Sequence, residues 1–227
     1  MPKLHYFDLY GRAEAARQAF TIAGVAFEDN RIGGEDWATL KASGKCEFGS
    51  MPMLELDDGT CLSQSMPIMR YVCKVYGGDK MIHSGDALAE WNADSLVAYW
   101  SDDFVGKKGP LIFKYVFNPA ADAVERDAEF TKIVDEMPAV FAKMEARFAK
   151  VDTKFLLGDK PSHFDICLGV SMCSMYQENG DDDKLKVWKT GYRTLIENGS
   201  YPKMNAFSQN YRALIADYLA ARPKCTI

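Results

Sequence analysis

The pattern of hydrophobic residues changes near residue 80, and this change constrains the fold more than any other feature of the sequence. Before it, short β-rich pieces alternate with helical ones, and after it every strong hydrophobic period is helical, with apolar residues at i, i+3 and i+4. A small β-α layer and a set of amphipathic helices bury their apolar faces in different ways. The sequence therefore predicts two domains, residues 1–79 and residues 80–227.

The first segment is typical of a small α/β domain of order β-α-β-(α)-β-β-α. Short runs of β-forming residues, punctuated by Gly, Pro and Asp-Gly, set this order. The expected elements are a strand around Leu4 and Tyr6, a helix over residues 11–23 that stops at Gly24, a strand over residues 25–32, a hairpin over residues 53–62, and a helix that Ser65 caps and that ends at Gly77.

The second segment predicts an all-α bundle. Apolar residues between Phe130 and Phe148 hold one stripe for five helical turns, with Pro138 inside it as an expected kink. Residues 162–165 form a capping box ahead of another helix, and a last helix is expected over residues 207–219. The fold class is thus an α/β N-terminal domain followed by an all-helical C-terminal domain.

Composition excludes several classes of protein. Hydrophobic residues make up 48% of the chain and charged residues 26%, which is typical of a folded protein. The net charge of −5 argues against nucleic-acid binding. Apolar runs are far shorter than the roughly 20 residues of a membrane span. With no signal peptide and six cysteines in no disulfide or zinc pattern, we expect free thiols and a cytoplasmic location.

Several short motifs occur in one order and spacing along nearly the whole chain. They are Leu4-His5-Tyr6-Phe7 with Gly11-Arg12-Ala13-Glu14, Asp36-Trp37 with Lys41, residues 49–54, Ser63-Gln64-Ser65, and residues 155–160 running into Asp165-Ile166. Together they resemble the cytosolic glutathione transferases, particularly the sigma class and its prostaglandin D synthase relatives. The resemblance implies a thioredoxin-like first domain, a two-fold homodimer, and glutathione as co-substrate with no further cofactor. The sigma-class prostaglandin synthases also bind a divalent ion near aspartates of the second domain, but we expect no metal here.

Tyr6 ends the first strand and is the candidate catalytic residue. A phenol has a reference pKa of about 10, so it keeps its proton at neutral pH and can donate to a thiolate. A glutathione thiol near 8.5 is only about 3% ionised at pH 7, and lowering its pKa by about two units needs about 2.7 kcal/mol. Arg12, at the helix start, is the second candidate catalytic residue, since its side chain could add positive charge. Hydrophobic periodicity alone indicates that Tyr6 is an inward-facing strand residue. Its position in the motif shared with the family favours the catalytic interpretation.

The loop and helix after residue 50 are candidates for binding the glutathione backbone and its γ-glutamyl carboxylate. The resemblance implies a cis bond at Met51-Pro52 that turns the backbone of Met51 toward the cysteinyl unit, where an ordinary edge-strand proline is the alternative. Gln64 and Ser65 precede a helix whose free N–H groups suit a carboxylate, and plain capping by Ser65 is compatible with that role.

Two further pairs are candidate glutathione contacts. Trp37 and Lys41 lie four apart, so an indole N–H and an ammonium can face the glycyl carboxylate together, although such pairs are usually packing contacts. In relatives, an aspartate in the region of Asp102 and Asp103 reaches the partner subunit's glutathione amine. Either residue fits here, and a solvated acidic pair is the alternative.

Aromatic residues near the first long helix of the second domain are candidates for a hydrophobic electrophile pocket. They are Tyr10, Tyr99 and Phe104, with Trp100 assigned to the core. The tryptophan expected after this helix in prostaglandin synthases is missing between Val105 and Ile112. The leading function is therefore conjugation of glutathione to small apolar electrophiles, with prostaglandin isomerisation and a non-catalytic scaffold as alternatives.

Overall fold

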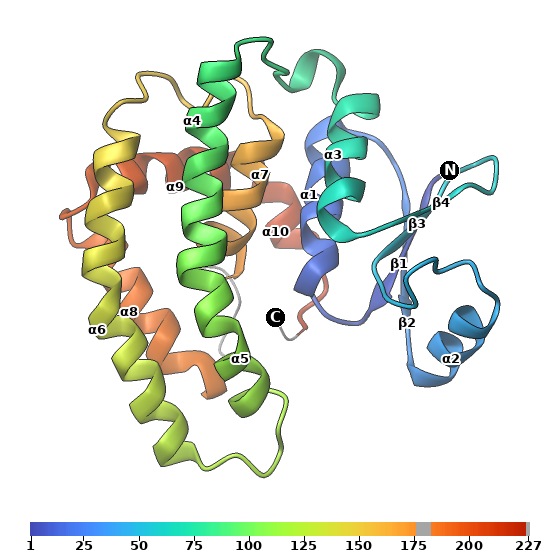
Figure 1. Ribbon diagram of the computed structural model, residues 1–227, viewed down its shortest axis with the longest axis horizontal. Coiled ribbons are helices and arrows are strands. Elements are labelled where there is room, and N and C mark those ends of the chain that lie inside the picture. The colour runs from blue at the N-terminus through green and yellow to red at the C-terminus, as the bar shows by residue number, and fades with distance from the viewer. Residues whose placement is uncertain (176–182, 226–227) are drawn as a thin grey trace.

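In the computed structural model, which describes residues 1–175 and 183–225, the first segment forms a four-stranded sheet (Figure 1). Its strand order is β2-β1-β3-β4, with β1 parallel to β2 and both other pairs antiparallel. The strands are β1 (Lys3–Phe7), β2 (Glu28–Ile32), β3 (Met53–Glu55) and β4 (Cys61–Ser63). The predicted hairpin is confirmed as β3 and β4, while the second strand begins at Glu28, three residues later than expected.

Three helices accompany the sheet: α1 (Glu14–Ala23), α2 (Gly34–Ala42) and α3 (Ser65–Tyr76). Figure 1 shows α1 and α3 side by side between the sheet and the helical part of the chain, with α2 at the outer end. Gly24 ends α1 at φ 68°, a left-handed conformation that glycine adopts without steric cost, as predicted. The predicted cap at Ser65 is wrong, because Ser65 is the first helical residue and Gln64 occupies the cap position without a side-chain hydrogen bond.

Apart from an isolated bridge between Phe155 and Gly158, the regular elements after α3 in the described residues are helical. The α-helices are α4 (Ala87–Ala98), α5 (Gly106–Tyr115), α6 (Ala123–Phe148), α7 (His163–Gly169), α8 (Lys186–Glu197), α9 (Pro202–Leu214) and α10 (Ala216–Ala221). Short 3-10 segments cover Gly11–Ala13, Gly78–Lys80 and Asp183–Leu185, and π-helical segments cover Tyr99–Val105 and Val170–Met175. No helix in residues 1–175 or 183–225 is both long enough and apolar enough to cross a membrane.

The last predicted helix is interrupted. Ile215 adopts φ −115° and ψ 19°, which ends α9 and starts the shorter α10. The apolar periodicity predicted one continuous helix because Phe207, Tyr211 and Ile215 are all buried, and a break between two helices that share a buried face leaves that pattern intact. The break turns α10 toward α1.

One apolar core runs through both parts of the chain. Trp100 is completely buried, its indole N–H donates to Ser171 Oγ at 2.6 Å, and its ring lies 4.8 Å from that of Phe104. The interpretation of Trp100 as a core residue is therefore confirmed.

A buried ionic cluster joins α1 to the last helix. The carboxylate of Glu14 is 0% exposed and accepts hydrogen bonds from Arg222 Nη1 at 2.7 Å, Tyr218 Oη at 2.8 Å and Gln18 Nε2 at 3.1 Å. Arg17 Nη1 lies 3.5 Å from the same carboxylate. A buried charge is tolerated only when it is paired and hydrogen-bonded, so this Glu14 cluster (Glu14, Arg17, Gln18, Tyr218 and Arg222) fixes α10 against α1.

The predicted capping box at the start of α7 is confirmed. Asp165 Oδ2 accepts the Ser162 N–H at 2.7 Å and the Ser162 hydroxyl at 2.5 Å, while Oδ1 accepts the Leu156 N–H at 2.8 Å. Burial raises the pKa of Asp165 to about 6, against the effect of these hydrogen bonds. Asp165 thus fastens the loop that precedes α7 to the helix itself.

We expect Asp165→Ala to lower the free energy of unfolding by about 2–3 kcal/mol, because two backbone N–H groups lose their acceptor where water cannot replace it. Urea unfolding measures the change. The matched control is Asp159→Ala, since Asp159 is exposed and accepts one long bond from the Lys154 N–H at 3.3 Å. That control should change stability by less than about 0.5 kcal/mol, and equal effects of the two substitutions would contradict the prediction.

Candidate functional site

Tyr6 lies at the end of β1 with its hydroxyl against the turn that begins the first helix. The side chain is 8% exposed, and its Oη accepts the backbone N–H of Arg12 at 3.0 Å. Because this contact uses a lone pair, the hydroxyl proton remains available to a second partner. Gly11, at φ 41°, makes the approach sterically possible, since a Cβ there would lie 2.7 Å from Tyr6 Oη. The turn therefore presents a phenol that is held as an acceptor and remains able to donate.

Two arginines, Arg12 and Arg17, lie at this turn. The side chain of Arg12 is half-buried and forms no ion pair with the residues that the structure describes. Arg17, whose guanidinium carbon is 5.8 Å from the centre of the Tyr6 ring, donates to the carbonyls of Leu9 and Tyr10 at 2.9 and 3.0 Å. Arg17 was not among the predicted site residues. Its position three residues after Glu14, in the motif Gly-Arg-Ala-Glu-Ala-Ala-Arg, is the only sequence signal for it.

Trp37 and Lys41 lie together on α2, as their spacing predicts. Lys41 Nζ is 5.7 Å from the centre of the Trp37 ring. Trp37 contacts Phe7 edge to face at 6.0 Å, and Phe7 follows Tyr6 on β1. This ring contact brings the Trp37–Lys41 pair to the same end of the sheet as Tyr6.

The loop before β3 contains the expected cis bond between Met51 and Pro52. Met51 is half-buried, and within the described part of the chain its backbone forms no hydrogen bond. A Cβ on Gly49 would lie 3.5 Å from Lys41 Cε, so the stem of Lys41 reaches this loop. A free strand-like backbone at this place can pair with an extended peptide.

Gln64 departs from ordinary backbone geometry. Its φ of 76° and ψ of 122° make it the one non-glycine residue with positive φ in residues 1–175 and 183–225. Such a conformation costs about 1–3 kcal/mol and is found most often at functional sites. The turn leaves the first N–H groups of α3, those of Ser65 and Met66, without helical partners or a side-chain cap. They form a ready receptor for a carboxylate.

Asp102 and Asp103 lie on the exposed side of the π-helical segment between α4 and α5. Asp103 Oδ1 is paired with Lys107 Nζ at 2.8 Å. Asp102 forms no ion pair with the described residues of its own chain, so of the two it has the freer carboxylate.

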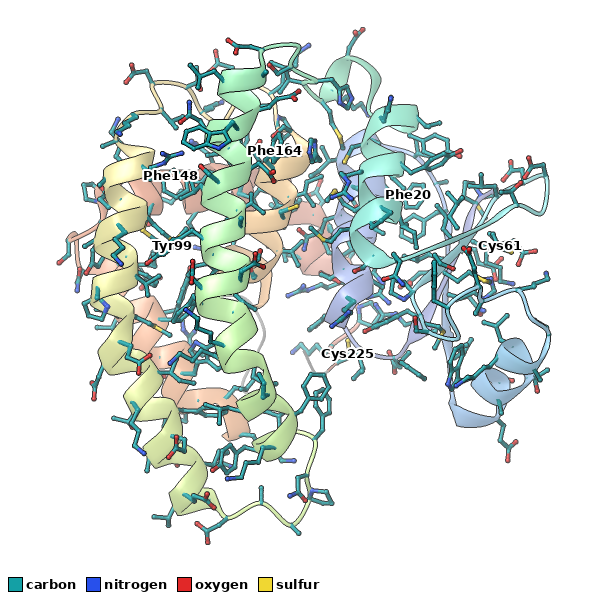
Figure 2. All side chains as sticks on the ribbon, in the orientation of Figure 1. Phe20, Cys61, Tyr99, Phe148, Phe164 and Cys225 are labelled. Carbon is teal, nitrogen blue, oxygen red and sulfur yellow. The ribbon has the colours of Figure 1, made fainter. Side chains whose placement is uncertain are left out.

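The three candidates for the electrophile pocket lie in different surroundings. Phe104 is 1% exposed and belongs to the core beside Trp100, while Tyr10 is 4% exposed and its hydroxyl donates to the carbonyl of Pro223 at 2.9 Å. Tyr99 lies between α4 and α6 (Figure 2), where Lys143 Nζ is 5.7 Å from its ring centre. The structure does not bring the three together, and it leaves Tyr10 and Phe104 no free surface for a ligand.

Sequence patterns could not separate these aromatic residues, because a pocket wall and a core present the same apolar side chains at the same helical spacing. All six cysteines are free thiols, as expected. Within residues 1–175 and 183–225, no group of three or more His, Cys, Asp or Glu side chains is arranged to hold a metal ion.

Comparison with known proteins identifies relatives of this chain. The model of the glutathione S-transferase N-terminal domain matches residues 2–74. The chain is 34% identical to glutathione S-transferase 1 of Ascaris suum over 178 residues, which cover 76% of this chain and 79% of that protein. It is 39% identical to the hematopoietic prostaglandin D synthase of Gallus gallus over 103 residues, 45% of this chain and 48% of that one.

Among solved structures, a Nu-class glutathione transferase from Haemonchus contortus superposes with a TM-score of 0.71 at 27% identity, over 100% of this chain and 98% of that chain. The similarity thus extends from the N-terminal sheet to the last helices. The chain belongs to the glutathione S-transferase family.

Proposed function

We propose that this enzyme joins the thiolate of glutathione to small apolar electrophiles, with Tyr6 stabilising the thiolate. The observation that carries the proposal is the hydrogen bond from the Arg12 N–H to Tyr6 Oη, at 3.0 Å. It orients the phenol and leaves its proton for the sulfur. A hydrogen bond to a charged group contributes about 1.5–3 kcal/mol, which covers most of the roughly 2.7 kcal/mol needed to lower a thiol pKa by about two units.

The remaining candidate residues suit the rest of the tripeptide. The free N–H groups at the start of α3, with Gln64 and Ser65, fit the γ-glutamyl carboxylate, and the unpaired backbone of Met51 before Pro52 fits the cysteinyl unit. Trp37 and Lys41 fit the glycyl carboxylate. In this arrangement the protein brings the reactants together and adjusts the thiol, and the added positive charge of Arg12 acts in the same direction.

The similarity to a prostaglandin D synthase supports a second candidate, an isomerase that uses glutathione catalytically on a lipid endoperoxide. That similarity covers less than half of either chain. The segment from Val105 to Ile112 also lacks the tryptophan expected in such enzymes. Turnover of a chloro-dinitrobenzene electrophile and of a prostaglandin endoperoxide, measured side by side, separates the two functions.

A homodimer is part of the proposal. Leu88 and Trp91, three apart on α4, are 67% and 59% exposed, which is unusual for large apolar side chains on one helix face. Asp102 lies further along the same long helical segment. A two-fold dimer across this helix would cover the apolar residues and bring Asp102 toward the partner's glutathione amine.

We expect Tyr6→Phe to lower conjugation turnover by roughly 10–100-fold, through loss of one hydrogen bond to the thiolate. The Michaelis constant for glutathione should change far less, because the carboxylates of glutathione are held elsewhere. Steady-state kinetics with a chloro-dinitrobenzene electrophile test both statements. Unchanged turnover would remove Tyr6 from the mechanism.

Lys41→Ala and Gln64→Ala should each raise the Michaelis constant for glutathione several-fold and leave turnover nearly unchanged, since both act far from the sulfur. Lys45→Ala is the matched control, because Lys45 is paired with Glu55 at 3.0 Å on the His5 side of the sheet. A loss of turnover with no change in that constant would show that these residues do not bind the carboxylates.

Asp102→Ala should weaken glutathione binding by about 5–150-fold, the equivalent of about 1–3 kcal/mol, while Asp103→Ala should have a smaller effect because Asp103 is already paired with Lys107. Calorimetric titration measures the affinity for glutathione. Sedimentation of the parent protein should show a species of twice the chain mass. A fully active monomer would refute the shared site.

A further inference from the structure

The last described residues of the chain lie against the turn that holds Tyr6. The Tyr10 hydroxyl donates to the Pro223 carbonyl at 2.9 Å and accepts the Cys225 N–H at 3.4 Å. Arg31 Nη1, from β2, contacts Cys225 Sγ at 3.3 Å. Figure 2 shows Cys225 between the sheet domain and the helical domain. A segment from the far end of the sequence therefore covers Tyr10 completely enough to bury it.

Arg222 anchors this segment. Its guanidinium is 2.7 Å from the Glu14 carboxylate, and its central carbon lies 4.0 Å from the centre of the Tyr10 ring. The Arg222 side chain is 3% exposed, so the ion pair and the ring contact are shielded from water. Arg222 thus contacts two residues of a single short stretch, Tyr10 and Glu14.

The stretch between these two contacts contains the group that orients Tyr6. Tyr10 and Glu14 enclose Gly11, Arg12 and Ala13, and the N–H of Arg12 donates to Tyr6 Oη. From within the first domain, Arg17 holds this stretch through the Leu9 and Tyr10 carbonyls. The C-terminal segment also holds it, through the Tyr10 hydroxyl and the Glu14 carboxylate.

We propose that the C-terminal segment Arg222–Cys225 is a positioning element for Tyr6. It acts through Tyr10 and Glu14 on the placement of the Arg12 N–H, and so on the direction in which the phenol donates. The inference rests on the proposed function, because it concerns the thiolate that Tyr6 is proposed to stabilise. A hydrogen bond weakens steeply when its angle departs from linearity, so a loosened turn reduces the stabilisation of the thiolate without removing any glutathione contact.

The experiment is a titration of the thiol of bound glutathione, followed by the ultraviolet absorbance of the thiolate and by the pH dependence of turnover. Three variants loosen the turn: Tyr10→Phe, removal of residues 223–227, and Arg222→Gln. Each should raise the pKa of the bound thiol by about 0.5–1 unit, a three- to tenfold loss of thiolate below that pKa. The Michaelis constant for glutathione should stay within about twofold, since no proposed contact to the carboxylates of glutathione is altered.

Arg222→Lys should recover part of the shift, because an ammonium retains the charge opposite Glu14 but loses the planar contact with the Tyr10 ring. The matched control is Arg126→Gln, which removes another largely buried arginine, paired with Asp127 at 2.9 Å and distant from the turn in sequence. It should leave the thiol pKa unchanged. Tyr10→Phe removes one oxygen atom, so it keeps the test decisive if Arg222→Gln or the truncation fails to fold.

A thiol pKa that stays at the parent value in folded Tyr10→Phe, or a shift that Arg126→Gln reproduces, overturns the inference. The same titration on Tyr6→Phe separates this outcome from failure of the proposed function. If Tyr6→Phe raises the thiol pKa and the other variants do not, only the role of the C-terminal segment is refuted. If Tyr6→Phe also leaves it unchanged, the role proposed for Tyr6 fails first.

Discussion

The buried carboxylate of Glu14 is the interaction on which the arrangement of the two parts depends. Transfer of an unpaired carboxylate from water to the interior costs many kcal/mol, so Glu14 is tolerated only with its hydrogen-bonding partners in place. Arg222, Tyr218 and Gln18 supply them at 2.7, 2.8 and 3.1 Å. Removing one charged partner of such a pair typically costs about 3–5 kcal/mol. The cluster therefore specifies one orientation of α10 against α1, in a way that apolar packing alone does not.

The same cluster also holds the turn that contacts Tyr6 at the end of β1. The turn approaches the Tyr6 ring so closely that only glycine fits at position 11. Arg17 holds the turn from one side through two carbonyl groups, and its guanidinium is itself held by Asp29 at 2.9 Å. The position of the Tyr6 hydroxyl thus follows from the buried charges around it rather than from the strand.

Local patterns predicted the elements that local interactions determine. The hairpin at residues 53–62, the stop at Gly24 and the capping box at Ser162 and Asp165 each depend on residues within a few positions of one another. The same reasoning failed at the start of α3, where Gln64 and not Ser65 occupies the cap position. A positive φ leaves no signal in the sequence, and serine is the more favoured N-cap residue. Most of the candidate glutathione contacts were predicted from the resemblance to the family, because hydrophobic periodicity carries no information about them.

What the sequence could not reveal depends on distant pairs. Arg222 and Glu14 are 208 residues apart, and Tyr10 and Pro223 are 213 apart, so neither contact leaves a mark within any window of residues. The burial of Tyr10 follows from such contacts. From sequence alone, an aromatic residue near a predicted site is assigned to the ligand pocket, because only the structure shows whether another segment covers it.

The site combines a rigid half with a lightly packed half. The Tyr6 turn is bound by buried charges, whereas α2, which carries Trp37 and Lys41, has no buried side chain and lies beside a polar cavity of 470 Å³ lined by His5, Asp36 and Glu55 among others. Burial lowers the pKa of His5, whose Nε2 lies 3.4 Å from the Glu55 carboxylate in this cavity. Because α2 makes few buried contacts, its local stability is low. The entropic cost of ordering the site on binding is therefore borne mainly by this helix. Rigidity is therefore concentrated at Tyr6, where a hydrogen-bond angle matters. In the proposed arrangement the glycyl carboxylate binds at α2, where attraction to the charge of Lys41 does not depend on an exact position of the helix.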